Sequence, residues 1–404
     1  MFTNRVSSLQ PEGAYAVLDR AQALEAQGRK ILHLEIGQPD FQTFPHICQA
    51  GIRAIENGQT RYTSPAGMPA LRQAIADYES ERLGLDPSTG SPVPAALAQA
   101  GQRLEPERIV VGPGAKPGLF FPTLALVNPG DEVIYPDPGF PTYEAMIRVA
   151  GGIPIPIPLR EENQFSFDLE VFDRKISDRT KLVILNSPAN PTGGVIPLDD
   201  LRHIAAKALA CGCWVLSDEI YGQLAYDGLI VPSIASLPGM LDHTVVVNGF
   251  SKTYAMTGWR LGYMVMPPAL AERVELLLTH SIGCTAAFTQ VAGIEALTGP
   301  QEMIAEIVAE YQRRRDFIVP GLNAIKGVSC QVPQGAFYVF PNVKSFGLSS
   351  KEIARRLLDE AGVAVLAGTD FGSGGEGYLR LCYATSVETI DQALGKMAGF
   401  FKSL

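Results

Sequence analysis

The chain has 404 residues, of which 46% are hydrophobic and 19% are charged, and its formal net charge is −9 at pH 7. A chain of this length exceeds one ordinary core, which predicts one large domain and a smaller one. The negative charge argues against nucleic-acid binding through a general basic surface.

Membrane and metal signals are weak in the sequence. The longest apolar run, residues 118–127, is too short to span a bilayer, and the N-terminal residues form no continuous apolar segment. The six cysteines include no Cys-x-x-Cys pair, so we expect no metal site. We therefore expect a cytoplasmic protein without a membrane segment.

The first predicted elements come before any polar cluster. Apolar residues recur at helical spacing within residues 14–30, residues 31–36 alternate like a strand, and residues 70–82 read as a second helix. Residues 83–107 are rich in proline, alanine, glycine and serine. We interpret them as a surface insertion, because loops tolerate insertion at low cost. A cover over the active site or a contact with a partner is the alternative.

Short strand-like runs then alternate with helical segments along the middle of the chain. This alternation predicts a mostly parallel sheet covered by helices on both faces. A long helix, residues 302–323, leads into a further strand at 337–340. The runs of the predicted sheet are residues 109–111, 132–135, 153–157, 182–185, 214–216, 245–247 and 263–265.

Polar residues follow three consecutive runs of this predicted sheet. Asn190 comes after the run at 182–185, Asp218 and Tyr221 follow the next run, and Lys252 follows the third. Ligands bind outside the carboxyl ends of strands in open α/β sheets. We therefore expect these four side chains to share one site.

Lys252 has neighbours that suggest its chemistry. A lysine held at a strand end among small residues can lose its hydration and its charge. The neutral amine is the form that makes a Schiff base with an aldehyde. Ser251 and Arg260 lie close by in the sequence and suit a phosphate dianion. The segment therefore predicts pyridoxal phosphate (PLP), an aldehyde that carries a phosphate.

Seven motifs, in this order along the chain, resemble those of the class I/II aminotransferases, the aspartate aminotransferase family of fold type I PLP enzymes. The resemblance covers nearly the whole chain. It implies an α/β large domain, residues 46–298, whose mostly parallel sheet is sandwiched by helices, and a smaller α+β domain formed by residues 1–45 and 299–404. It also implies a homodimer with shared active sites. The motifs lie at residues 37–41, 62–67, 114–116, 186–193, 214–221, 248–260 and 378–381.

The resemblance implies a role for each cofactor-binding side chain. Lys252 would form the Schiff base and then move a proton between the substrate and the cofactor. Asp218 would keep the pyridine nitrogen protonated. Asn190 and Tyr221 would donate to the phenolate oxygen, and Phe140 would stack on the ring.

The phosphate would be held by several groups at once. The turn before a helix offers backbone amides to an anion. Gly249 stands where the family often has a serine, so one hydroxyl contact is missing or replaced. Tyr62 matches a tyrosine that crosses the dimer interface, although it could also be a packing residue at a helix entry. The expected phosphate-binding residues are Gly114, Ala115, Lys116, Ser251, Arg260 and Tyr62 of the partner subunit.

The substrate carboxylate would be bound by Arg380, with Gly37 and Asn190 beside it, because a guanidinium suits a bidentate pair. Side-chain specificity is less defined. The lysine that matches Lys116 contacts a distal carboxylate in some relatives but is common in others. Two further candidates at the entrance, Glu12 and His280, could equally be solvated surface residues; Glu12 could meet a cationic substrate group.

An aminotransferase, which moves an amino group between an L-amino acid and a 2-oxo acid, is the first interpretation. A PLP-dependent lyase, dehydratase or cyclase is the alternative, because such enzymes keep the same residues and differ in later steps. A non-catalytic regulator would need a DNA-binding module, and we expect none.

Overall fold

A twisted sheet forms the centre of the computed structural model, which describes residues 3, 7, 9, 11–84 and 103–404. Its strand order is β2-β8-β7-β6-β5-β3-β4, and all neighbours are parallel except the two pairs that β8 makes. The mostly parallel sheet predicted from the sequence is therefore confirmed. The strands are β2 (Ile109–Gly112), β3 (Glu132–Asp137), β4 (Ile153–Pro158), β5 (Thr180–Asn186), β6 (Trp214–Asp218), β7 (Thr244–Gly249) and β8 (Gly262–Val265).

Helices cover both faces of this sheet, because successive side chains of its strands point in opposite directions. In β7, Val245 and Val247 join one apolar cluster and Val246 joins another. The first cluster also contains residues of α5 (Lys116–Leu126), α6 (Thr142–Ala150) and α9 (Pro268–Thr279). The opposite face is covered by α4 (Pro69–Arg82), α7 (Leu169–Lys175), α8 (Leu198–Cys211) and α10 (Ala287–Thr298), and α3 (Pro45–Glu56) packs on α10.

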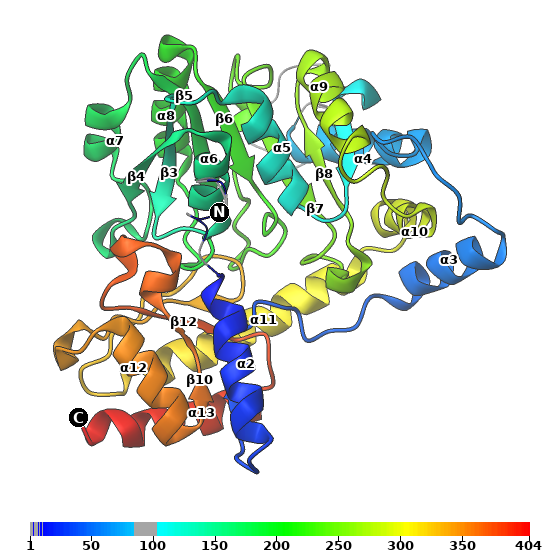
Figure 1. The fold of residues 1–404 in the computed structure, drawn as a ribbon. Coiled ribbons are helices and arrows are strands. Elements are labelled where there is room, and N and C mark those ends of the chain that lie inside the picture. Colours follow the sequence, from blue (N-terminus) through cyan, green and yellow to red (C-terminus); the bar gives the residue numbers. More distant parts are fainter. Residues whose placement is uncertain (1–2, 4–6, 8, 10, 85–102) are drawn as a thin grey trace.

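The two ends of the chain pack together beside the large sheet (Figure 1). Leu32 of β1 pairs in parallel with Val363 of β10, and a three-stranded antiparallel sheet has the order β11-β12-β9. The division at residues 46 and 298 stays a prediction. The elements of this part are α2 (Gly13–Glu25), β1 (Leu32–His33), α11 (Glu302–Asn323), β9 (Tyr338–Val339), α12 (Ser350–Arg356), β10 (Val363–Ala364), β11 (Leu366–Ala367), β12 (Leu379–Cys382) and α13 (Val387–Lys402).

The terminal elements differ most from their predicted bounds. The helix predicted over 14–30 ends at Glu25, and the strand predicted over 31–36 is reduced to the two residues that β10 can pair with. The helix over 302–323 has its predicted bounds. Most of the predicted insertion, residues 85–102, lies outside the described residues. Among the helices that are described, none has the length and apolarity that crossing a membrane requires.

Candidate active site

Three parallel strands end at the same edge of the large sheet. Asn186, at the end of β5, pairs with Asp218, at the end of β6, and Asp218 pairs with Val247 of β7. The side-chain amide of Asn186 donates to the Asp218 carbonyl (3.0 Å), and its oxygen accepts from the backbone N–H of Asn190 (2.9 Å). This register gathers the segments that carry Asn190, Asp218 and Lys252, as the sequence predicts.

Lys252 lies at the centre of this edge with its amine partly buried. The Nζ atom donates a hydrogen bond to the Gly37 carbonyl (2.7 Å). It also lies 5.7 Å from the ring centroids of both Tyr221 and Phe337. Burial lowers the pKa of Lys252 to about 8. A much larger fraction of Lys252 is therefore in the neutral, nucleophilic form than of an ordinary lysine at the same pH.

Asp218 is buried, with 5% of its surface exposed, and its partner was not identified from the sequence. The hydroxyl of Tyr143 donates to its Oδ2 atom (2.7 Å). Burial raises the pKa of Asp218 to about 6, against the opposing effect of the Tyr143 hydrogen bond. A cationic N–H group beside this buried carboxylate would stabilise its ionised form. Tyr143 lies in the first turn of α6, and its ring meets that of Phe140, which precedes the helix, edge to face.

Tyr221 meets a second tyrosine that the sequence did not single out. Its hydroxyl lies 2.7 Å from that of Tyr338 on β9, and both residues are buried. In the turn that follows β5, the Oδ1 atom of Asn190 is buried and has no hydrogen-bond partner among the described residues. Such an atom is costly to bury unless a ligand or water satisfies it.

The turn before α5 faces Arg260. The Arg260 guanidinium donates to the carbonyls of Pro113 (3.3 Å) and Thr257 (3.0 Å). Gly114 has φ 88° and leaves no space for a β-carbon, which would collide with that guanidinium. The backbone amides that begin α5 and the arginine thus lie together, a combination that suits a phosphate. Ser251 is buried in the turn that follows β7.

Gly249, the last residue of β7, lies where two backbones approach closely. An added β-carbon there would lie 3.0 Å from the Gly262 Cα atom and 3.1 Å from the Leu261 carbonyl oxygen. The last residues of β7 and β8 pair at this point, Gly249 with Gly262. A side chain at Gly249 would therefore require the facing backbone to move by a few tenths of an ångström.

Arg380 lies on β12 with only 2% of its surface exposed. Its guanidinium stacks over the rings of Tyr338 (4.6 Å) and Phe371 (5.2 Å), and its Nη2 atom donates to the Glu35 carbonyl. The Nε atom is buried without a partner among the described residues. Gly37 packs against the Tyr338 hydroxyl and has no room for a β-carbon. An anion between Gly37 and Arg380 would satisfy this guanidinium.

The residues of the entrance are spread over helix starts and ends. Phe140 meets Tyr143 edge to face, with the ring centroids 5.8 Å apart, and the Lys116 ammonium lies 5.3 Å from the Phe140 centroid. Tyr62 is 98% exposed and does not join the cluster within one chain. His280 is exposed at the end of α9. The entrance is thus more open than the centre.

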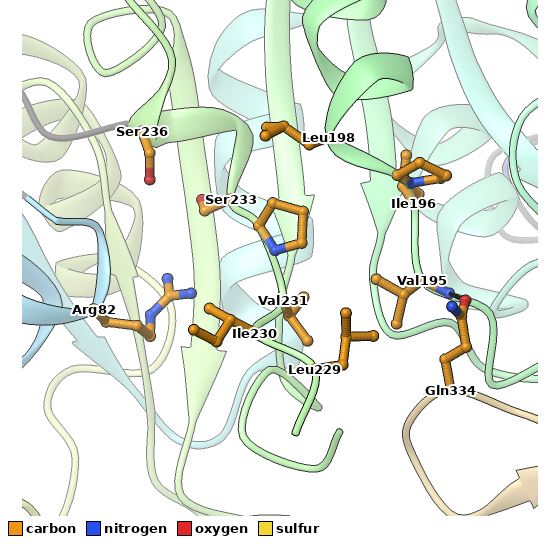
Figure 2. Close-up of a pocket in the computed structure, with 12 residues that line it drawn as sticks. Arg82, Val195, Ile196, Leu198, Leu229, Ile230, Val231, Ser233, Ser236 and Gln334 are labelled. Atoms are coloured by element: carbon orange, nitrogen blue, oxygen red, sulfur yellow. Dashed lines mark hydrogen bonds between the residues drawn. The ribbon is translucent and has the colours of Figure 1, made fainter. Parts of the chain in front are cut away.

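A cavity of about 290 Å³ lies elsewhere and includes none of the predicted site residues. Figure 2 shows Arg82 and Ser233 among the residues that line it, together with apolar side chains that include Leu229 and Ile230. Arg82 is already paired with Glu219 (2.6 Å) and with a second carboxylate on its own helix. This cavity therefore offers no unpaired charge to a ligand.

The strand-end cluster fits PLP by the chemistry of its donors. It combines an amine of lowered pKa in Lys252, a buried carboxylate in Asp218 and an anion site between α5 and Arg260. The unpartnered buried atoms of Asn190 and Arg380 are further places where a bound cofactor or substrate would complete hydrogen bonds.

The chain is similar in sequence and in fold to proteins named as aminotransferases. Residues 29–397 match the family described as aminotransferase class I and II. The chain is 38% identical over 384 residues to an aspartate aminotransferase of Pyrococcus horikoshii, covering 94% of this chain and 92% of that protein. It is 34% identical over 402 residues to the aromatic-amino-acid aminotransferase 2 of Thermococcus litoralis, covering 99% and 98%.

The fold agrees with these relatives. The solved structure of an alanine aminotransferase from Pyrococcus furiosus superposes with a TM-score of 0.91 at 32% identity, covering all of both chains. Such relatives favour amino-group transfer over the elimination or cyclisation that the sequence had left open. The chain therefore belongs to the class I and II aminotransferases, a fold type I family that uses PLP to move amino groups between amino acids and 2-oxo acids.

Proposed function

We propose that PLP binds at the carboxyl ends of β5, β6 and β7, with Lys252 as the residue that attaches to it. The observation that carries this proposal is the position of the Lys252 amine at the carboxyl edge of the sheet, where it bonds to the Gly37 carbonyl and where burial lowers its pKa to about 8. When bound, the cofactor supplies an electron sink for the carbanion formed at the substrate Cα. Lys252 then moves the proton to and from that carbon as general base and acid.

Asp218 is proposed to hold the proton on the pyridine nitrogen. Its burial and its bond from Tyr143 support this role, because they fix the carboxylate and leave it short of positive charge. Asn190 and Tyr221 are proposed to donate to the phenolate oxygen, and Phe140 to cover the ring. Tyr338 orients the Tyr221 hydroxyl in this arrangement, since the two hydroxyls lie 2.7 Å apart.

The phosphate is proposed to lie between the start of α5 and Arg260, where Gly114, Ala115 and Lys116 supply backbone amides and Ser251 a hydroxyl. The substrate α-carboxylate is proposed to bind Arg380, with Gly37 and Asn190 beside it. The stacking of Arg380 on Tyr338 supports this role because it holds the guanidinium plane in one orientation.

A homodimer with shared sites is the proposed assembly. The exposure of Tyr62 supports it, because a large aromatic side chain with 98% of its surface in solvent is unusual unless a partner covers it. The partner subunit's Tyr62 would then reach the phosphate. The cytoplasmic location expected from the sequence stays a prediction.

A half-reaction screen tests the proposed function. The purified enzyme is mixed with single amino acids, including aspartate, phenylalanine and alanine, in the absence of any oxo acid. We expect stoichiometric conversion of bound PLP to pyridoxamine phosphate that stops after one turnover, and the donor that reacts fastest names the side-chain preference. Continued turnover with the aldehyde form of the cofactor regenerated would contradict the proposal.

A further inference from the structure

Glu12 and Lys116 form an ion pair at the mouth of the proposed site that none of the roles above uses. Glu12 directly precedes α2, and Lys116 is the first residue of α5. The Glu12 Oε1 atom accepts a hydrogen bond from the Lys116 ammonium and a longer one, 3.4 Å, from the Thr142 hydroxyl. The pair therefore joins the N-terminal segment to the starts of two helices that surround the proposed cofactor site.

The ammonium of this pair lies against an aromatic residue of the proposed site. Lys116 Nζ is 5.3 Å from the Phe140 ring centroid, and Phe140 contacts Tyr143, which binds Asp218. Two aromatic side chains, Phe140 and Tyr143, thus lie between this cation and the buried Asp218. A substrate side chain that extends from the centre toward the mouth would approach this ammonium.

Glu12 is held in place from the other side of the mouth. Gly13 packs so closely on Asp370 that an added β-carbon would lie 2.5 Å from the Asp370 Cγ atom. The next residue, Phe371, stacks on the Arg380 guanidinium. The backbone that positions Glu12 is therefore built on the same loop that supports the proposed carboxylate site.

We infer that Glu12 competes with the distal carboxylate of a dicarboxylic substrate for the Lys116 ammonium, so that Glu12 disfavours aspartate-like substrates relative to substrates with neutral side chains. This inference rests on the proposed function. A distal carboxylate that takes Lys116 must displace the Glu12 carboxylate and then lies near its negative charge. A neutral side chain leaves the ion pair intact.

The size of the effect follows from exposure. The side chains of Lys116 and Glu12 are 50% and 27% exposed, so solvent screens their attraction. For E12Q, which removes the charge and keeps the shape, we expect binding of a dicarboxylate to tighten about fivefold at low ionic strength. The gain should shrink as salt is added.

The test measures binding of two unreactive four-carbon acids to the holoenzyme by calorimetry: succinate, with two carboxylates, and butyrate, with one. The expected result is a rise in the ratio of succinate to butyrate affinity in E12Q and no such rise when E12Q is added to K116M. E144Q is the matched control, because Glu144 lies on α6 and pairs with Arg148 instead (2.6 Å). Its ratio should stay at the wild-type value.

An equal gain for both acids in E12Q, or the same gain in the K116M background, would overturn the inference. The half-reaction screen on the same wild-type preparation separates this failure from that of the proposed function. If wild-type enzyme converts an amino acid in one turnover but E12Q leaves the ratio unchanged, only the role of Glu12 is wrong. If no amino acid is converted, the proposed function is wrong, whatever the ratio.

Discussion

The buried centre and the entrance of the proposed site are built in different ways. Asp218 and Arg380 are almost fully buried and lie on strands, whereas Lys116 and Glu12 are partly exposed and lie at helix starts. The strand residues are fixed by register and by aromatic partners. The helix-start residues are fixed by an ion pair that salt can weaken. The chemistry is thus assigned to the rigid region and the choice of substrate to the exposed one.

Lys252→Ala, in the buried centre of the site, should reduce activity more than any other change considered. The variant loses both the amine that attaches PLP and the group that moves the proton, so we expect kcat to fall by about a thousandfold or more. Borohydride reduction followed by mass spectrometry should detect no cofactor adduct. Lys207→Ala, which removes a lysine paired with Asp173 on the surface, serves as the control. An undiminished adduct in the Lys252 variant would show that another lysine carries the cofactor.

Arg380→Ala tests whether the α-carboxylate is bound in the buried region. Loss of one charged hydrogen bond is worth about 1.5–3 kcal/mol, so we expect kcat/KM to fall by about a hundredfold. An ammonium carries the same charge but lacks the planar, two-pronged donor geometry of the guanidinium, so Arg380→Lys should recover only part of the loss. Steady-state kinetics with the best donor measures both. Unchanged kcat/KM would assign the carboxylate to a different residue, such as one at the entrance.

Asp218→Asn probes the cost of burying a carboxylate in the cofactor-free enzyme. Burial raises the pKa of Asp218 from 3.8 to about 6, so the folded protein keeps a proton that the unfolded chain has released in this window. The stability that protonated Asp218 gives the folded protein is fully present below the unfolded pKa of 3.8. It is lost as the pH rises through the folded pKa of about 6. Asparagine cannot titrate, so between about pH 4 and pH 7 the variant should gain about 2 kcal/mol relative to wild type.

Urea unfolding of the cofactor-free wild type and of Asp218→Asn at both pH values measures this difference. A constant difference across the pH range would mean that Asp218 is ionised and compensated in the folded protein. The buried region would then carry less electrostatic cost than its burial indicates.

Gly249→Ser tests how tightly the backbones of β7 and β8 are packed at the buried centre, and it should have the smallest effect. The new side chain would meet the Gly262 backbone at 3.0 Å, and overpacking of this kind costs about 1–3 kcal/mol. We expect a lower denaturant midpoint, with any added phosphate contact too weak to offset it. Gly258→Ser, which has open space around its Cα, is the control and should change stability little. Equal stability of the two variants would show that β8 moves freely.

The fold and the centre of the site could be predicted because their signals are local in the sequence. Each strand-like run is followed within a few residues by its polar group, and parallel register then brings Asn190, Asp218 and Lys252 to one edge. The resemblance to a known family added roles to these residues. The substrate and dimer contacts at the entrance carry no such local signal.

Pairs between distant segments could not be predicted. Tyr143 and Asp218 are 75 positions apart, Tyr221 and Tyr338 are 117 apart, and Glu12 and Lys116 are 104 apart. These contacts form only when α6, β9 and the residue before α2 come together with the large domain in the folded chain. The short strand β1 was overextended in the prediction for the same reason, because its length is limited by its distant partner, β10.

The pairing of β1 with β10 has a consequence for the growing chain on the ribosome. Leu32 finds its partner, Val363, only after most of the polypeptide has been synthesised, whereas the strands of the large sheet all lie between residues 109 and 265. Domains fold as their residues emerge, and apolar segments without partners are prone to aggregate. The N-terminal helix and strand therefore wait longest for a native partner, and a premature stop before residue 363 would leave them without one.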